Sequence, residues 1–348
     1  MVIQSVHLTH FRNFEKATFN FSPVMTLIVG ENARGKTSLL EAVFTSVYGT
    51  GFRESRESEL IQWEQDQGLV ESVFLESGSD TLFQIQLRKE AEERVKKTFY
   101  VSKTLKTFFQ YHKLQTQAVL FAPQHIEVIT GSPSRRRVYV DGVLSAFDFE
   151  YRKKLRNYEN ALRKRNKILE QFVNMQQLQQ EITFWNDYLV DQATYLTTKR
   201  TEYAQYLNNN NKLKGKEFSI QYIKNEFTNE RLGQVLPQEL RMRRTVIGPQ
   251  KDDFVLYLHH PTKKNVSLFG SRSEQRMAIF WLKLQELQLF ERASNRKPLL
   301  LLDDIFSELD SHNRELVMKM IGEYQTIATT TEEEIKGLTR LPEEVIRL

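Results

Sequence analysis

The sequence predicts an α/β fold in which one sheet-bearing domain, the head, is divided by an inserted, mainly helical lobe. Two short apolar runs, residues 26–29 and 299–302, are typical of buried parallel strands. A helical pattern follows the first run and another precedes the second, and helices that alternate with buried strands indicate an α/β arrangement. Between the two halves, residues 149–212 contain no Gly or Pro and are rich in Gln, Lys, Arg and Leu. The lobe is therefore predicted to be an insertion in the head.

The length of 348 residues corresponds to about two domains at roughly 150 residues each. We expect an N-terminal head part over residues 1–110, the lobe over 111–240 and a C-terminal head part over 241–348. No run of about 18 apolar residues is present, and the N-terminus lacks a basic segment followed by an apolar one. Cysteine is absent, which excludes disulfides and cysteine-ligated metals. These features favour a cytoplasmic protein with no membrane partner.

The remaining elements follow from hydrophobic periodicity. In the first half, strands are expected at residues 2–8, 17–21, 26–29, 69–74, 82–87 and 98–101, and a helix at 38–47. In the second half, strands are expected at 254–258, 299–302 and 326–329, and a helix at 274–291. In the lobe, apolar residues recur at helical spacing: Leu155, Tyr158, Leu162 and Leu169, then Trp185, Leu189, Leu196, Tyr203 and Leu207. They predict two or three long helices that end at the polar residues 208–211.

Residues 30–37 match the phosphate-loop pattern G-x-x-x-x-G-K-[ST] at every specified position. The glycines allow backbone N–H groups to point at phosphate oxygens, and the N-terminus of the following helix favours their charge. Lys36 is predicted to reach the β- and γ-phosphates as a catalytic residue, and the Thr37 hydroxyl to ligate Mg²⁺. The expected ATP-binding residues are Gly30, Glu31, Asn32, Ala33, Arg34, Gly35, Lys36, Thr37 and Ser38.

Two acids, Asp303 and Asp304, follow directly after the apolar run at 299–302. This order places them at the carboxyl edge of a sheet, where nucleotides bind. Asp303 is predicted to hold Mg²⁺, and Asp304 to orient or deprotonate the attacking water. The alternative is an acid pair that only caps a strand-to-turn junction, and the phosphate loop makes this the weaker interpretation.

Two further segments resemble motifs of ABC-type ATPases. Ser307, Glu308, Leu309 and Asp310 resemble the D-loop, which touches the partner subunit across a bound nucleotide. Residues 269–276 resemble the signature motif, in which a serine, here Ser271, contacts ATP bound to the opposite protomer. A simple helix start is the competing interpretation of the second segment, with Ser271 or Ser273 as N-cap and Glu274 or Gln275 near the third helical position.

The chain resembles the RecF family in short segments that run in order from about Leu8 to Thr331. They include residues 11–14 (FRNF), 39–42 (LLEA), 52–56 (FRESR), 120–123 (LFAP), 131–137 (GSPSRRR), 245–249 (TVIGP), 252–254 (DDF) and 303–310 (DDIFSELD). Several of these segments are not general ABC features. The resemblance implies an SMC-like ABC ATPase head without the long coiled coil.

The same resemblance implies a function in replication, repair and the SOS response. RecF proteins bind ATP, form ATP-dependent homodimers and bind DNA at single-strand gaps or duplex junctions. There they assist recombinase loading with the RecO and RecR proteins, and they are weak DNA-dependent ATPases. Three positions depart from the family: Ser273 replaces a usual Gly, Gln124 replaces a common acid and is a candidate Q-loop residue, and Gln250-Lys251 replaces a His-Arg pair.

The net charge of +5 is modest, but basic residues are concentrated between residues 151 and 169. Such a block is either a phosphate-binding surface or a solvated helix face. The candidate DNA-binding residues are Arg53, Arg56, Arg135, Arg136, Arg152, Lys153, Arg163 and Lys164. The runner-up function is an ATP-binding DNA scaffold with little or no hydrolysis. The basic inserted lobe disfavours a transporter subunit. The lobe is also too short for the long coiled coil of an SMC-type structural ATPase.

Overall fold

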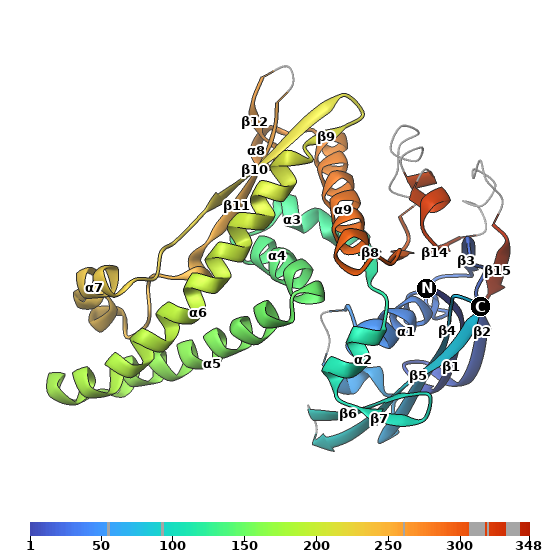
Figure 1. The fold of residues 1–348 in the computed structure, drawn as a ribbon, viewed down its shortest axis with the longest axis horizontal. Coiled ribbons are helices and arrows are strands. Elements are labelled where there is room, and N and C mark those ends of the chain that lie inside the picture. Colours follow the sequence, from blue (N-terminus) through green and yellow to red (C-terminus); the bar gives the residue numbers. More distant parts are fainter. Residues whose placement is uncertain (54–55, 92–93, 260–261, 306–316, 319, 332–341) are drawn as a thin grey trace. The chain divides into compact units, whose positions relative to one another are not determined.

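The computed structural model describes residues 1–348 except 54–55, 92–93, 260–261, 306–316, 319 and 332–341 (Figure 1). The chain forms two compact units: the head unit, Met1–Gln124 with Glu286–Leu348, and the lobe unit, His125–Gln285. These boundaries differ from the expected 110/111 and 240/241. The reason is strand pairing, because β8 (Ala118–Phe121) joins the sheet of β13 (Leu299–Leu302) and β11 (Asp253–Leu258) pairs with β10 (Lys216–Ile223).

The head unit contains a parallel five-stranded sheet with strand order β15-β3-β14-β13-β8. The strands not yet defined are β3 (Met25–Val29), β14 (Thr326–Thr330) and β15 (Glu344–Arg347). Every residue of β3, β13, β14 and β8 is buried, as expected for a parallel sheet covered on both faces. Helix α1 (Lys36–Tyr48) follows β3, so the predicted strand, loop and helix are confirmed.

The second sheet of the head unit is antiparallel, with order β2-β1-β4-β5-β6-β7. Its strands are β1 (Val2–Phe11), β2 (Phe14–Asn20), β4 (Gln67–Glu76), β5 (Ser79–Ala91), β6 (Arg94–Val101) and β7 (Thr104–Lys106). Alternate residues of β4 and of the middle of β5 are buried, which gives this sheet one core face and one outer face. The core face, α1 and the parallel sheet share one hydrophobic cluster. The short helices η1 (Glu57–Leu60) and α2 (Phe108–Leu114) complete the unit before β8.

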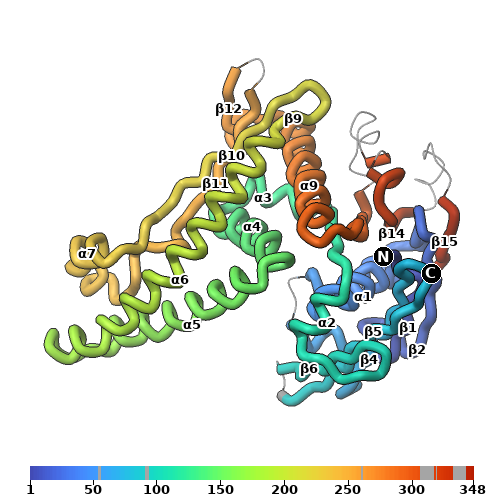
Figure 2. The backbone as a smooth tube through the Cα atoms, viewed as in Figure 1, coloured from blue at the N-terminus to red at the C-terminus, as the bar shows by residue number. Residues whose placement is uncertain are grey.

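The lobe unit is dominated by two long helices, α5 (Phe149–Gln171) and α6 (Met175–Asn209), which lie side by side (Figures 1 and 2). They confirm the two or three helices expected from apolar spacing. The short helix η2 (Pro123–Ile126) spans the boundary between the two units. The other helices of the lobe unit are α3 (Glu127–Thr130), α4 (Pro133–Phe147), α7 (Asn229–Met242), η3 (Pro249–Lys251) and α8 (Val266–Phe269). Strands β9 (Lys212–Leu213), β10, β11 and β12 (Lys264–Asn265) form a sheet in the order β12-β11-β10-β9. Helix α9 (Arg272–Ser294) runs past the boundary at Gln285 in sequence.

Candidate nucleotide-binding site

The phosphate loop connects β3 to α1, and its backbone requires glycine at two positions. Gly35 has φ of 106°, and a Cβ there would lie 2.5 Å from Asn13 Nδ2. At Gly30 a Cβ would lie 2.8 Å from the backbone oxygen of Leu348, which follows β15. Both contacts are too short for an alanine. The sequence pattern therefore corresponds to a tight loop that begins at the carboxyl end of β3 and turns directly into the N-terminus of α1.

Lys36 lies across the loop that carries it. Its ammonium Nζ donates to the carbonyl oxygens of Gly30 at 2.6 Å and of Glu31 at 3.0 Å, and the residue is 8% exposed. The charge is thus held against the loop backbone on the side where a helix N-terminus favours anions. A lysine so placed supplies a fixed positive charge next to bound phosphate.

The predicted metal ligands lie together at the sheet edge. Thr37 Oγ1 donates to Asp303 Oδ1 at 3.0 Å, and Thr329 Oγ1, from β14, donates to the same oxygen at 2.9 Å. Burial raises the pKa of Asp303 above its usual 3.8, and the hydrogen bonds from Thr329 and Thr37 oppose that rise. A hydroxyl and a carboxylate are the hard oxygen donors that Mg²⁺ prefers. The chemistry of this pair fits Mg²⁺.

Asp304 differs sharply from its neighbour. Its side chain is exposed and its φ is 50°, in the left-handed region. The backbone N–H of Asp304 donates to Thr329 Oγ1 at 2.8 Å, so one threonine on β14 fixes both acids. The buried acid can hold a metal, while the exposed acid remains accessible to water.

A buried cluster behind the loop was not predicted from the sequence. Glu41, fully buried on α1, accepts hydrogen bonds from Arg12 Nε at 2.7 Å and Nη2 at 3.1 Å. Arg53 approaches the same carboxylate, with Nε to Oε2 at 3.4 Å, and its Nη2 donates to Ser38 at 3.1 Å. Arg53, a candidate DNA-binding residue, therefore lies close behind the phosphate loop. Two sequence signals existed: Glu41 lies four residues after Thr37, one helical turn along the same face, and all three charged residues belong to segments that resemble RecF.

The other residues singled out in the sequence lie outside the phosphate loop and the β13 edge. Gln124 is exposed in η2, just beyond the carboxyl end of β8, and β8 pairs with the strand that carries Asp303. The D-loop residues Ser307, Glu308, Leu309 and Asp310 lie outside the described residues. Gln250, one of the family departures, is bound within the lobe unit, where its Nε2 donates to the Ile247 carbonyl at 2.7 Å.

Ser271 and Glu274 form a capping box at the start of α9. The Ser271 N–H donates to Glu274 Oε2 at 2.8 Å, and the Glu274 N–H donates to Ser271 Oγ at 3.3 Å. Lys264 Nζ donates to both carboxylate oxygens of Glu274 at 2.9 Å. Partial burial alone would raise the pKa of Glu274, but the hydrogen bonds from Lys264 and Ser271 lower it to about 2. The capped helix start is thus present, and it fixes the position of Ser271, the serine that corresponds to the ABC signature motif.

A family model described as the RecF/RecN/SMC N terminal domain matches residues 2–339. The chain belongs to this RecF/RecN/SMC family. Among its relatives is the DNA replication and repair protein RecF of Lachnospira eligens, 29% identical over 343 residues that cover 95% of this chain and 93% of that protein. RecF of an Exiguobacterium species is also 29% identical, over 352 residues that cover 95% of this chain and 92% of that protein.

Solved structures of the family have the same fold. The recombination mediator protein RecF in the RecFOR pathway matches with TM-scores of 0.87 in its ATPrS structure and 0.85 in its ATP structure, each at 24% identity over 99% of this chain and 95% of that chain. An Smc head domain derived from Pyrococcus furiosus matches with a TM-score of 0.50 at 15% identity, over 97% of this chain and 91% of that chain. The predicted ABC-type head with an inserted helical lobe is confirmed. Among the described helices, none has the length and apolar character needed to cross a membrane.

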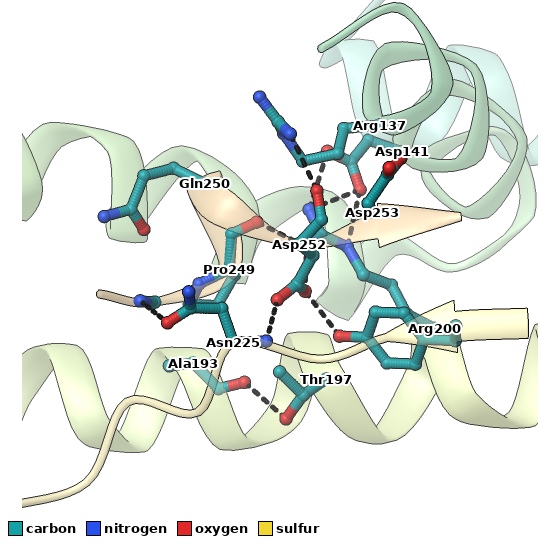
Figure 3. Close-up of polar contacts among 12 residues, drawn as sticks. Arg137, Asp141, Ala193, Thr197, Arg200, Asn225, Pro249, Gln250, Asp252 and Asp253 are labelled. Carbon is teal, nitrogen blue, oxygen red and sulfur yellow. Dashed lines mark hydrogen bonds and ion pairs between the residues drawn. The ribbon is translucent and has the colours of Figure 1, made fainter. Parts of the chain in front are cut away.

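The basic triplet that helped to suggest the RecF family is bound within the lobe unit, and Figure 3 shows its last member, Arg137, beside Asp252 and Asp253. Arg136 donates to both carboxylate oxygens of Asp253, at 2.7 and 3.1 Å, and Arg137 donates to the Asp252 carbonyl at 2.7 Å. Burial and the nearby Arg200 lower the pKa of Arg137. Arg135 is more exposed and pairs with Glu127 at 3.1 Å. These arginines therefore contribute to the structure of the lobe unit.

The candidates on α5 are more accessible. Lys153, Arg163 and Lys164 are exposed, whereas Arg152 is only half-exposed, and burial together with Arg156 lowers the pKa of Arg152. Arg165, in the same basic block, is 1% exposed and donates to Glu239 at 2.6 Å. Arg56 is exposed in the head unit. The block therefore contains both a solvated basic face and a buried ion pair, which its composition could not distinguish.

Proposed function

We propose that this chain is an ATP-dependent, DNA-binding recombination-repair protein. It binds ATP with Mg²⁺ in the head, dimerises around the nucleotide and assists recombinase loading at single-strand gaps. The observation that carries the proposal is the 3.0 Å contact between Thr37 Oγ1 and Asp303 Oδ1. It joins the phosphate loop to the acid at the end of β13, two segments separated by most of the chain.

The head residues suit weak ATP hydrolysis. Mg²⁺ would be held by the Thr37 hydroxyl and the Asp303 carboxylate, and when bound it would neutralise phosphate charge. Lys36 supplies a second positive charge. Exposed Asp304 is the residue that can accept a proton from water, and the hydrogen bond from its N–H to Thr329 holds the backbone in place.

ATP-dependent dimerisation is expected from the two motifs, the signature and the D-loop, that contact the nucleotide bound to the opposite protomer. In ABC-type heads, the signature serine of one protomer completes the nucleotide site of the other. Ser271 is fixed at the N-terminus of α9 by the Glu274 capping box, which suits it to contact an anion. The D-loop residues 307–310 are assigned the complementary contact by resemblance.

DNA and protein partners are proposed from the family. Relatives are called DNA replication and repair protein RecF, and the similar structures are of a recombination mediator in the RecFOR pathway. We therefore expect DNA at a gap or duplex junction, RecO and RecR as partners, an involvement in the SOS response, and activity in the cytoplasm. Basic residues on α5 supply the charge for phosphate contacts.

A second candidate is an ATP-binding DNA scaffold with little or no hydrolysis. Ser273 favours it, because RecF proteins usually have glycine at that position and a side chain there can hinder the approach of phosphate. Exposed Asp304 disfavours it. The two functions share nucleotide binding and differ in turnover.

Size-exclusion chromatography with light scattering, with and without Mg-ATP and then with gapped DNA, tests the proposal. Wild-type protein should change from monomer to dimer with ATP and bind the gapped DNA more tightly in that state. Lys36→Ala is the matched control and should stay monomeric, because it lacks the phosphate charge. A wild-type protein that stays monomeric at saturating Mg-ATP and ignores gapped DNA would refute both candidates.

A further inference from the structure

Three aromatic side chains form a cluster on one stretch of α6. Phe184 is 62% exposed, and Trp185 and Tyr188 are partly exposed. The Phe184 and Trp185 rings meet edge to face with centroids 5.0 Å apart, and the Phe184 and Tyr188 rings lie 6.3 Å apart and nearly parallel at 19°. The cluster is preformed, because the rings already support one another. An exposed group of large aromatics on a protein surface usually marks a binding site.

The neighbouring helix α5 adds positive charge to this cluster. Lys164 Nζ lies 4.8 Å from the centroid of the Trp185 ring. Exposed basic residues at helical spacing extend from it along one face of α5: Lys153, Arg156, Arg163, Lys164 and Lys167. From the first to the last, this basic face is about 21 Å long at 1.5 Å per residue.

Few carboxylates neutralise the basic face. Lys153 lies 3.9 Å from Glu150, which is a weak exposed contact. Arg163 donates to the amide oxygen of Asn160 and interacts electrostatically with Glu159. Asp187, next to the aromatic cluster, accepts a hydrogen bond from Asn229. Within the part of the chain that the structure describes, Arg156 and Lys167 have no hydrogen-bonded or ionic partner. The surface therefore combines several available cations with exposed ring faces.

We propose that Phe184, Trp185 and Tyr188 form a stacking platform for unpaired bases of single-stranded DNA, whose phosphates contact the basic face of α5. The inference rests on the proposed function and assigns its single-strand contact to this surface. Duplex DNA would use the cations but not the rings, because its bases are stacked inside the helix. Single-stranded nucleic acid uses both, and base–aromatic stacking tolerates any sequence.

Binding of a fluorescent oligo(dT) and of a duplex of equal length tests the platform, in the presence of Mg-ATP. We expect Trp185→Ala and Phe184→Ala to weaken oligo(dT) binding about 10- to 100-fold, the effect of losing one stacked base, and to change duplex binding less than threefold. Trp63→Ala is the matched control, since Trp63 is 85% exposed in the head unit. It should leave both affinities unchanged. Trp185→Phe should restore most of the oligo(dT) affinity.

A strand of abasic residues of the same length separates stacking from charge. It should bind the wild type as weakly as oligo(dT) binds Trp185→Ala, and the substitution should not weaken it further. Unchanged oligo(dT) affinity in a folded Trp185→Ala protein would overturn the platform, as would an equal loss of oligo(dT) and duplex binding. A wild type that binds the duplex but not oligo(dT) overturns the platform alone. A wild type that binds neither also overturns the proposed function.

Discussion

At the scale of single residues, two buried carboxylates behind the phosphate loop have different roles because they have different partners. Glu41 is fully buried and accepts hydrogen bonds from the guanidinium group of Arg12. Asp303 is 7% exposed and its direct partners are the hydroxyls of Thr37 and Thr329. A carboxylate already paired with guanidinium groups is a structural anchor, whereas one bound only by hydroxyls can still ligate a cation.

Glu41→Gln should destabilise the head unit and lower ATP affinity. The substitution leaves Arg12 and Arg53 without their shared counter-charge, and breaking a buried pair costs about 3–5 kcal/mol. Urea unfolding and calorimetric ATP titration measure the two effects. Glu59→Gln is the control, because Glu59 is 53% exposed and lies 3.6 Å from Arg12. If both variants unfold at the same urea concentration, Glu41 is not an anchor.

Asp304→Asn should retain ATP but lose turnover. Asp304 is the more exposed acid of the pair, and general-base catalysis contributes about 10²–10⁴-fold. Steady-state phosphate release on gapped DNA should fall by at least about 100-fold, while the dissociation constant for ATP changes little. Wild-type turnover in the variant would remove the assigned role, and the scaffold function would then gain support if the wild type is equally slow.

At the scale of elements, the sequence predicted the strands and helices with strong local patterns. The apolar run at Leu299–Leu302 and the helical spacing of Tyr158 and Leu162 were sufficient, because the buried face shows in neighbouring residues. Strand β8 was not predicted as a strand, although it is a run of four buried apolar residues like β13. Its partner β13 lies far along the chain, which also explains why the boundary of the head unit lies at Gln124 and differs from the predicted one at residue 110.

Site residues could be predicted from the sequence where they belong to one continuous motif. Lys36 and Thr37 belong to one motif, and Asp303 and Asp304 follow one strand. Thr329 could not be found in this way, because its hydrogen bonds to the two acids join β14 to β13 and depend on the order of strands in the sheet. Local patterns contain no information on such pairing.

The buried pair between α5 and α7 should couple these helices strongly. Arg165→Leu leaves Glu239 as an uncompensated buried charge and should cost about 3–5 kcal/mol of unfolding free energy. The double variant Arg165→Leu with Glu239→Leu should recover much of that loss. Lys154→Ala, which removes a pair with the 67% exposed Asp191, should cost less than about 1 kcal/mol. Additive losses in the double variant would contradict the coupling.

The start of α9 should become less stable in acid. The pKa of Glu274 falls from its usual 4.5 to about 2, so the folded state favours the charged form. This contribution is fully present above pH 4.5 and is lost as the pH falls toward 2. Hydrogen exchange of α9 amides between pH 5 and 3 should therefore rise relative to intrinsic rates, and Glu274→Gln should abolish that pH dependence. An unchanged profile in the variant would contradict the assignment.

At the scale of the whole molecule, DNA binding should be electrostatic and largely indifferent to sequence. Arg163→Glu with Lys164→Glu should weaken binding to all sequences about equally and reduce the slope of log affinity against log salt by about 0.7–0.9 for each lost phosphate contact. Lys16→Glu with Lys103→Glu makes the same change of net charge on exposed residues of the head unit. Equal effects of the two pairs would indicate that only net charge matters. No effect of the first pair would exclude α5 and leave the head residues as candidates.

The position of β3 in its sheet has a consequence for synthesis on the ribosome. Both neighbours of this strand, β14 and β15, come from the last residues of the chain, at 326–330 and 344–347. The strand that carries the phosphate loop is translated early but has no sheet partner until those residues emerge. At about 5–20 residues per second, this interval is roughly 15–60 s. A nascent chain should therefore be unable to hold ATP until residues 326–347 have been synthesised, and its unpaired apolar strand is a natural target for chaperones during that time.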